Sequence, residues 1–158
     1  FPEPLPLTED TLFDMAPLSK LMGTSMAALR LIDKGMLHLT DKVGDFFENC
    51  YGKENITIYQ LMTHPSGIPA FFHMWKMNID PADAARVILE YPLAAPTGSK
   101  VIYSCMGYIL LGRILEKICG ETLEEPIQGS DRLVEIILQY VLLLNNHRFQ
   151  KHSPYVRE

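Results

Sequence analysis

One candidate pair of catalytic side chains lies in the segment Thr63-His-Pro-Ser-Gly67, where a single residue separates His64 from Ser66. A histidine beside a serine is the combination that activates the hydroxyl nucleophile of many serine hydrolases. The segment lacks, however, the Gly-x-Ser-x-Gly pattern of the sharp turn that exposes such a serine. We therefore interpret it as a structural turn.

Metal ligands and cysteines show no recognised spacing. No two histidines are four residues apart beside a glutamate, and the cysteines form no Cys-x-x-Cys pair. The sequence therefore predicts no metal site, no cofactor and no dense disulfide framework. The residues concerned are His38, His64, His73, His147 and His152, with Cys50, Cys105 and Cys119.

Acidic pairs offer a third kind of chemistry. Two carboxyl groups on either side of a bond can hydrolyse a glycoside, and Glu124-Glu125 and Asp80/Asp83 are such pairs. Pairs of this kind are more typical of solvated faces, so we keep glycoside hydrolysis as an alternative only.

Composition restricts the class of protein. The 158 residues are 47% hydrophobic and 21% charged, which is typical of one globular domain. The net charge is −5 with no basic run, so we expect no nucleic-acid partner. The longest apolar run, Leu133 to Leu144, is interrupted by Glu135 and Gln139 and is shorter than the ~20 residues of a membrane span. We expect no membrane association, and the N-terminal sequence indicates no compartment.

Helical spacing dominates the elements that must position these side chains. Apolar residues recur at intervals of three and four from Pro17 to about Lys34, and Gly35 stands at the place of a left-handed C-cap. Strand signals are scarce, and the run from Leu133 to Leu144 favours a helix over a strand. Further helices are predicted at Val43–Phe47, Ile58–His64, from Asp80-Pro81 to Pro92, and Met106–Ile118.

Four sequence strings occur in one order along the chain. They are FDMAPLSK (13–20), KGMLHLTDKV (34–43), ITIYQLMTHPSGIP (56–69) and YSCMGYILLG (103–112). This order resembles the serine β-lactamase and penicillin-binding-protein-like superfamily. The branch it resembles most contains class C β-lactamases, D-aminopeptidases and esterases, with the usual strings FDxASxTK, LLTHTSGLP and YSNxGYxLLG. The resemblance covers residues 11 to 125.

The resemblance implies a mechanism. That family uses a serine at the start of a helix, a lysine one turn later that takes its proton, and a tyrosine from a neighbouring loop that relays the proton to the leaving group. The lysine matches Lys20 and the tyrosine matches Tyr103. Residues three apart share a helix face, so the amine can reach the hydroxyl. Lys20 and Tyr103 are therefore the predicted catalytic residues.

The chain departs from the family at the nucleophile. Three residues before Lys20 stands Pro17, which cannot be acylated, and no Ser-x-x-Lys string occurs elsewhere. Ser19 is the nearest substitute, but it lies about 200° around a helix from position 17 and should face elsewhere. Cys105 replaces the family's asparagine, and is more typical of a small buried residue. The Lys-Thr-Gly or His-x-Gly strand that completes the family's oxyanion hole has no counterpart.

We expect a mainly α fold, a single helical domain resembling the helical region of the β-lactamase-like fold with the sheet largely absent; a small α+β domain is the alternative. The expected division is an extended lead-in (1–10), the helical domain (11–125) and a divergent C-terminal segment (126–158). The absent sheet would expose apolar surface, so we expect a homodimer. The functional hypotheses are hydrolysis of a small amide or ester, a catalytically inactive remnant or binding module, and glycoside hydrolysis.

Overall fold

The computed structural model describes residues 17–73, 77 and 79–120. These residues form helices and one isolated β-bridge, between Lys42 and Thr57. The mainly α fold predicted from the sequence is therefore confirmed, while the predicted lead-in 1–10, the segment 126–158 and its apolar run lie outside the described residues. In chain order the elements are the π-helix η1 (Lys20–Ser25), α1 (Met26–Asp33), α2 (Val43–Phe46), α3 (Ile58–Thr63), the 3₁₀ turn η3 (Pro81–Asp83), α4 (Ala84–Glu90) and α5 (Cys105–Cys119).

Local capping signals set the helix boundaries. The Thr57 hydroxyl accepts the Gln60 N–H at 3.2 Å and the Gln60 side chain accepts the Thr57 N–H at 3.0 Å, a capping box that starts α3. The Ser104 hydroxyl accepts the Gly107 N–H at 2.9 Å and starts α5, which ends at the left-handed Gly120. The predicted helix from Met106 to Ile118 is thus confirmed and is one residue longer at each end.

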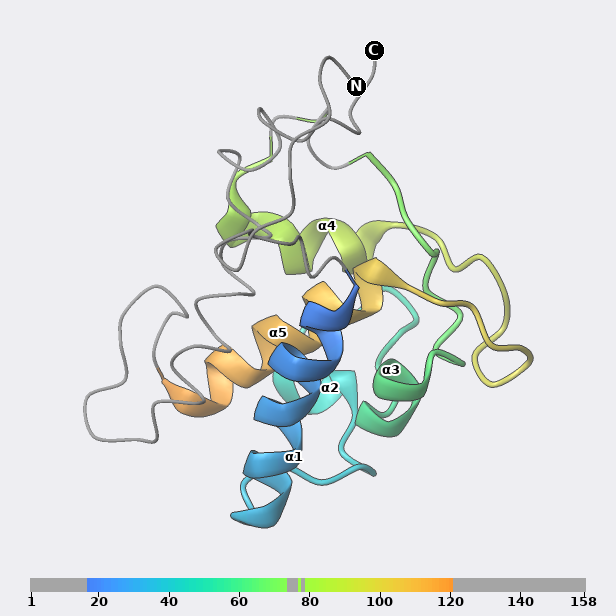
Figure 1. Ribbon diagram of the computed structural model, residues 1–158. Coiled ribbons are helices and arrows are strands. Elements are labelled where there is room, and N and C mark those ends of the chain that lie inside the picture. Colours follow the sequence, from blue (N-terminus) through green and yellow to red (C-terminus); the bar gives the residue numbers. More distant parts are fainter. Residues whose placement is uncertain (1–16, 74–76, 78, 121–158) are drawn as a thin grey trace, which may run out of the picture.

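The central helix is α5, since η1, α2, α3 and α4 all pack against it (Figure 1). Along α5 an apolar face is fully buried and continues the core formed by α1, α3 and α4. The α5 residues of this core are Met106, Leu110, Leu111, Ile114 and Leu115.

The first helix differs from its prediction in two respects. It is α-helical at Leu18 and Ser19, continues as the π-helix η1 and returns to an α-helix at Met26, whereas the spacing predicted one α-helix from Pro17. π turns are rare and often lie at functional sites. It ends as predicted at Gly35, whose N–H donates to Ile32 O, while the Met36 N–H donates to Leu31 O; together these form a Schellman motif.

Most large apolar side chains of the first helix face outward; Leu31 is an exception, since it is buried in the core. The core side of the helix is formed instead by smaller residues, among them Gly23, Thr24, Ala27 and Ala28, which allow a close approach to α5. A continuous apolar face of this kind is uncommon on a monomer, so the expected self-association stays a prediction. Its exposed members are Leu18, Leu21, Met22, Met26 and Leu29.

A buried lysine ties the segment after α2 to α4. Lys53 is 2% exposed, and its ammonium donates a hydrogen bond of 2.5 Å to the carbonyl of Leu89 in the last turn of α4. Burial lowers the pKa of Lys53 below the ordinary lysine value. A cation near the C-terminal end of a helix is also favoured by the helix dipole.

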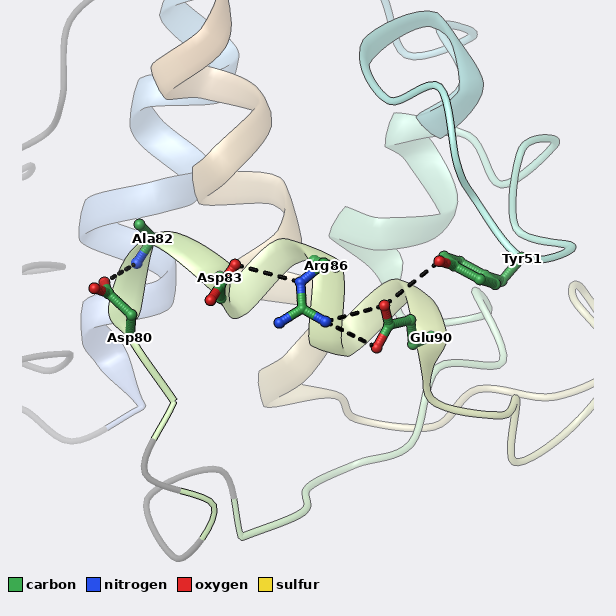
Figure 2. A network of polar contacts seen from close by, with 6 residues as sticks. All are labelled: Tyr51, Asp80, Ala82, Asp83, Arg86 and Glu90. Carbon is green, nitrogen blue, oxygen red and sulfur yellow. Dashed lines mark hydrogen bonds and ion pairs between the residues drawn. The ribbon is translucent and has the colours of Figure 1, made fainter.

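The outer face of α4 carries a set of charged contacts, which we call the α4 network (Figure 2). Arg86 pairs with Asp83 at 3.3 Å and with Glu90 at 3.0 Å, and Tyr51 donates to Glu90 at 3.4 Å. Asp80 accepts the Ala82 N–H at 2.9 Å and so starts the η3 turn.

Over the described ranges, no helix has the length and apolarity required to cross a membrane.

Candidate functional site

The predicted catalytic residues Lys20 and Tyr103 lie next to each other, although 83 positions separate them in the chain. The Lys20 ammonium is 5.3 Å from the centroid of the Tyr103 ring, within cation–π distance. Lys20 is half-buried in the first turn of η1, and Tyr103 is 50% exposed in the loop before α5. The fold therefore brings together the two residues that the family resemblance selected.

Pro17 lies one tight turn before Lys20. The Lys20 N–H donates to the Pro17 carbonyl at 3.0 Å, so the pyrrolidine ring occupies the place three residues before the amine. Pro17 is exposed, whereas Ser19, the other residue considered as a nucleophile, is 3% exposed. The hydroxyl nearest to Lys20 in the sequence is thus on a buried side chain.

His64 holds the loop that carries Tyr103. It ends α3 in the left-handed conformation, with φ of 75°. Its carbonyl accepts the Ile102 N–H at 2.9 Å, and its ring Nδ1 accepts the Ser104 N–H at 3.1 Å. The backbone amides on both sides of Tyr103 are therefore bonded to one residue.

The His64 ring also contacts two tyrosines. Its centroid is 4.7 Å from that of Tyr103 and 5.2 Å from that of Tyr108. Burial lowers the pKa of His64 below the usual 6.5, and the positive charge of Lys20 lowers this pKa further. The neutral imidazole is consequently the form that fits this surrounding.

Tyr108 connects the histidine to η1 through a chain of hydroxyl groups. Its hydroxyl donates to the Met62 carbonyl at 3.0 Å, and it lies 3.1 Å from the Ser25 hydroxyl. Because the phenol has one proton, Ser25 is the donor of the second bond. We call Lys20, His64, Tyr103, Ser104 and Tyr108 the site cluster; they come from η1, the end of α3, the loop before α5, and α5 itself.

Ser104 and Cys105 fix the start of α5 beside the site. Besides capping α5, the Ser104 hydroxyl donates to the Pro69 carbonyl at 2.7 Å, and the Cys105 N–H donates to the Ala70 carbonyl at 2.9 Å. Cys105 is half-buried, and its thiol is not in a disulfide. The backbone of Cys105 therefore joins the start of α5 to the loop that follows α3.

The other sequence candidates have structural contacts. Ser66 is 1% exposed, and its hydroxyl accepts the Ile68 N–H two residues on, as expected for a turn. Asp80 and Asp83 belong to the α4 network, and Glu124-Glu125 lies outside the described residues. Within the described segments, no group of three or more histidine, cysteine, aspartate or glutamate residues could hold a metal ion.

Sequence reasoning missed the part that His64 plays. It identified His64 only with Ser66, as a turn, because the two are adjacent in the sequence. A signal was present nonetheless: a histidine at the C-terminal end of a helix, where glycine or asparagine is usual, requires a reason for its left-handed backbone.

Comparison with known proteins agrees with the motifs. The sequence profile of the family described as Beta-lactamase matches residues 2–129. The chain is 31% identical over 136 residues to an N-acetylmuramyl-L-alanine amidase of Bacillus subtilis (strain 168), covering 77% of this chain and 31% of that protein. It is 29% identical over 143 residues to a putative D-alanyl-D-alanine carboxypeptidase of Escherichia coli (strain K12), covering 81% of this chain and 33% of that protein.

A solved structure shares the fold. The crystal structure of a penicillin binding protein from Bacillus halodurans superposes with a TM-score of 0.56 and 27% sequence identity, over 65% of this chain and 35% of that one. The chain spans about a third of the length of the curated relatives it matches. By the extent of the profile match and the order of its motifs, it belongs to the beta-lactamase family of hydrolases.

Proposed function

We propose that this chain binds amide or ester ligands of the kind that its relatives process and does not form an acyl-enzyme with them. The observation that carries the proposal is the position of Pro17. It stands one turn before Lys20, where the resemblance places the nucleophilic serine, and a proline ring has no atom that can be acylated. The replacement of this one group removes the covalent step and leaves Lys20 and Tyr103 beside each other.

The burial of Ser19 supports the same conclusion. A nucleophile must be reached by the carbonyl carbon of its substrate, and a side chain that is 3% exposed does not offer such access. The ligand class follows from the relatives, whose names include an amidase and a carboxypeptidase. A lysine ammonium and a phenol are groups that can hold the carbonyl or carboxylate oxygen of such a ligand.

Mass spectrometry of the intact protein tests the proposal. The folded chain is incubated with a reactive β-lactam and, separately, with a fluorophosphonate. We expect no adduct on the native protein. The variant Pro17→Ser restores a hydroxyl one turn before Lys20, and we expect it to gain one probe molecule at least about tenfold faster than the native chain. Pro17→Ala is the matched control, since it removes the ring without adding a hydroxyl.

Two results would overturn the proposal. A stoichiometric adduct on the native chain, mapped to Ser19 or any other serine, would establish a relocated nucleophile. Equal lack of labelling in Pro17→Ser and Pro17→Ala would show that Pro17 is not what prevents acylation.

A second candidate is hydrolysis without an acyl intermediate. The contact between Lys20 and Tyr103 favours it, because a lysine amine in its uncharged form can take a proton from water while a phenol beside it passes its own proton to a leaving group. Turnover of a chromogenic lactam or a short-chain ester that Lys20→Met abolishes would support this function. Turnover of an aryl glycoside would instead point to a carboxylate pair.

A further inference from the structure

His64 makes three contacts with Tyr103 and the residues on either side of it. Its carbonyl bonds the amide before Tyr103, its ring Nδ1 bonds the amide after it, and the two rings lie 4.7 Å apart. Of these three contacts, the hydrogen bond at Nδ1 depends on whether the imidazole carries a second proton. The loop position of Tyr103 is therefore coupled to the charge state of one histidine.

We propose that His64 is a positioning residue that holds Tyr103 beside Lys20, and that protonation of His64 releases the loop Ile102–Ser104. The site cluster is thus closed when the imidazole is neutral and open when it is charged. The inference concerns the regulation of the site described above and rests on the proposed function for its biological meaning.

The chemistry of the imidazole explains the direction of the switch. A neutral ring that accepts a bond at Nδ1 has its proton on Nε2. A second proton must go to Nδ1, which then becomes a donor and faces the Ser104 N–H, another donor. The hydrogen bond is lost, and the amide must turn toward water or another acceptor.

The groups around His64 act in the same direction. The groups that face the ring are Lys20 from η1, Tyr103 from the loop and Tyr108 from α5. The Lys20 ammonium repels a charged imidazole, and burial lowers the pKa of His64 as well. Because the folded state has the lower pKa, the unfolded chain binds more protons below pH 6.5. The stabilisation is complete above that pH and declines as the pH falls through the folded-state pKa.

Amide hydrogen exchange of the full ¹⁵N-labelled chain tests the proposal without any ligand. Exchange is measured at about pH 8 and about pH 4.5 and expressed as protection, the intrinsic rate divided by the observed rate. We expect the protection of the Ser104 amide to fall at least about tenfold at the acidic pH. The adjacent Cys105 amide bonds Ala70 rather than His64, so its protection should change less than about twofold. Ring ¹⁵N shifts of His64 report its protonation in the same samples.

Two variants at position 64 complete the test. His64→Asn retains a side-chain acceptor and tolerates the left-handed backbone, so Ser104 should be protected equally at both pH values. His64→Gly retains the backbone and lacks the acceptor, so Ser104 should be unprotected at both.

Several results would overturn the proposal. They are a Ser104 amide that stays protected while the His64 ring is charged, a ring that stays neutral down to about pH 4.5, and a joint loss of protection at Ser104 and Cys105. The same holds if His64→Asn retains the native pH dependence. None of these readouts involves acylation or ligand binding, so this inference and the proposed function can fail separately.

Discussion

The site cluster and the α4 network are both polar, but they are built in opposite ways. The α4 network contains the formal charges Asp80, Asp83, Arg86 and Glu90 within one short stretch, with Tyr51 the one distant member. The site cluster contains one ammonium and draws its members from four parts of the chain. The hydrogen bonds from Ser104 to His64 and from Tyr108 to Met62 span 40 and 46 positions, whereas the ion pairs of α4 join residues three or four apart.

This difference shows which kind of polar interaction stabilises the fold. Ion pairs along an exposed helix are screened by water and salt and contribute little to stability. Hydrogen bonds in the site cluster fix loops whose amides would otherwise be unpaired, so their loss should cost more. The number of charges is therefore a poor guide to the functional part of this molecule, and the convergence of distant segments is a better one.

The largest loss of stability is expected from a substitution in the loop that follows His64. Gly67 has φ of +79°, and a Cβ there would overlap the Ala95 carbonyl oxygen. Gly67→Ala should therefore lower the free energy of unfolding by about 3 kcal/mol or more, through backbone strain and overlap together. Urea denaturation measures the change.

Gly52→Ala is the matched control for this substitution. Gly52 has φ of +84°, but nothing lies within 4 Å of the added carbon, so the strain alone should cost about 1 kcal/mol. Equal costs at positions 52 and 67 would show that the loop near His64 can shift to make room.

An intermediate effect is expected at the N-cap of α5. Ser104→Ala removes the acceptor for the Gly107 N–H and the donor to the Pro69 carbonyl, both provided by a hydroxyl on a side chain that is 1% exposed. We expect a loss of about 2 kcal/mol in the free energy of unfolding. The control is Ser99→Ala, whose exposed hydroxyl donates to Pro96 and should cost less than about 0.5 kcal/mol. A Ser104 variant no weaker than the Ser99 variant would contradict the comparison.

The smallest effect is expected in the α4 network itself. Arg86→Ala removes both ion pairs at once, yet all three side chains are at least 40% exposed. The urea midpoint should shift less than in Ser99→Ala, and any shift should disappear in high salt. A larger, salt-resistant shift would show that the α4 network contributes as much to stability as the site cluster does.

The fold was predictable where the signals are local. The helices predicted at Ile58–His64 and Met106–Ile118 are both present, and they start and end at caps that need only neighbouring residues, Thr57 for α3 and Gly120 for α5. The helix predicted between Asp80-Pro81 and Pro92 is also present, as η3 and α4. Each of these predictions rests on interactions within one or two helical turns.

The remaining features depend on distant partners. The π turns of η1 leave no trace in hydrophobic spacing, and that spacing does not reveal that the small residues of the first helix face the core. Lys20 and Tyr103 were selected by family motifs, and their contact across the fold is a tertiary fact. The bonds from His64 to the amides around Tyr103 have no periodic pattern that a sequence could display.

The buried amine of Lys53 can report how often the structure around it opens. Reagents that acylate lysines need an accessible, uncharged amine, and the Lys53 amine is enclosed against the end of α4 while Lys34, Lys42 and Lys100 are exposed. Under native conditions its modification can proceed only as often as the segment after α2 separates from α4. The labelling rate at this one position, followed by peptide mapping, therefore counts those separations directly.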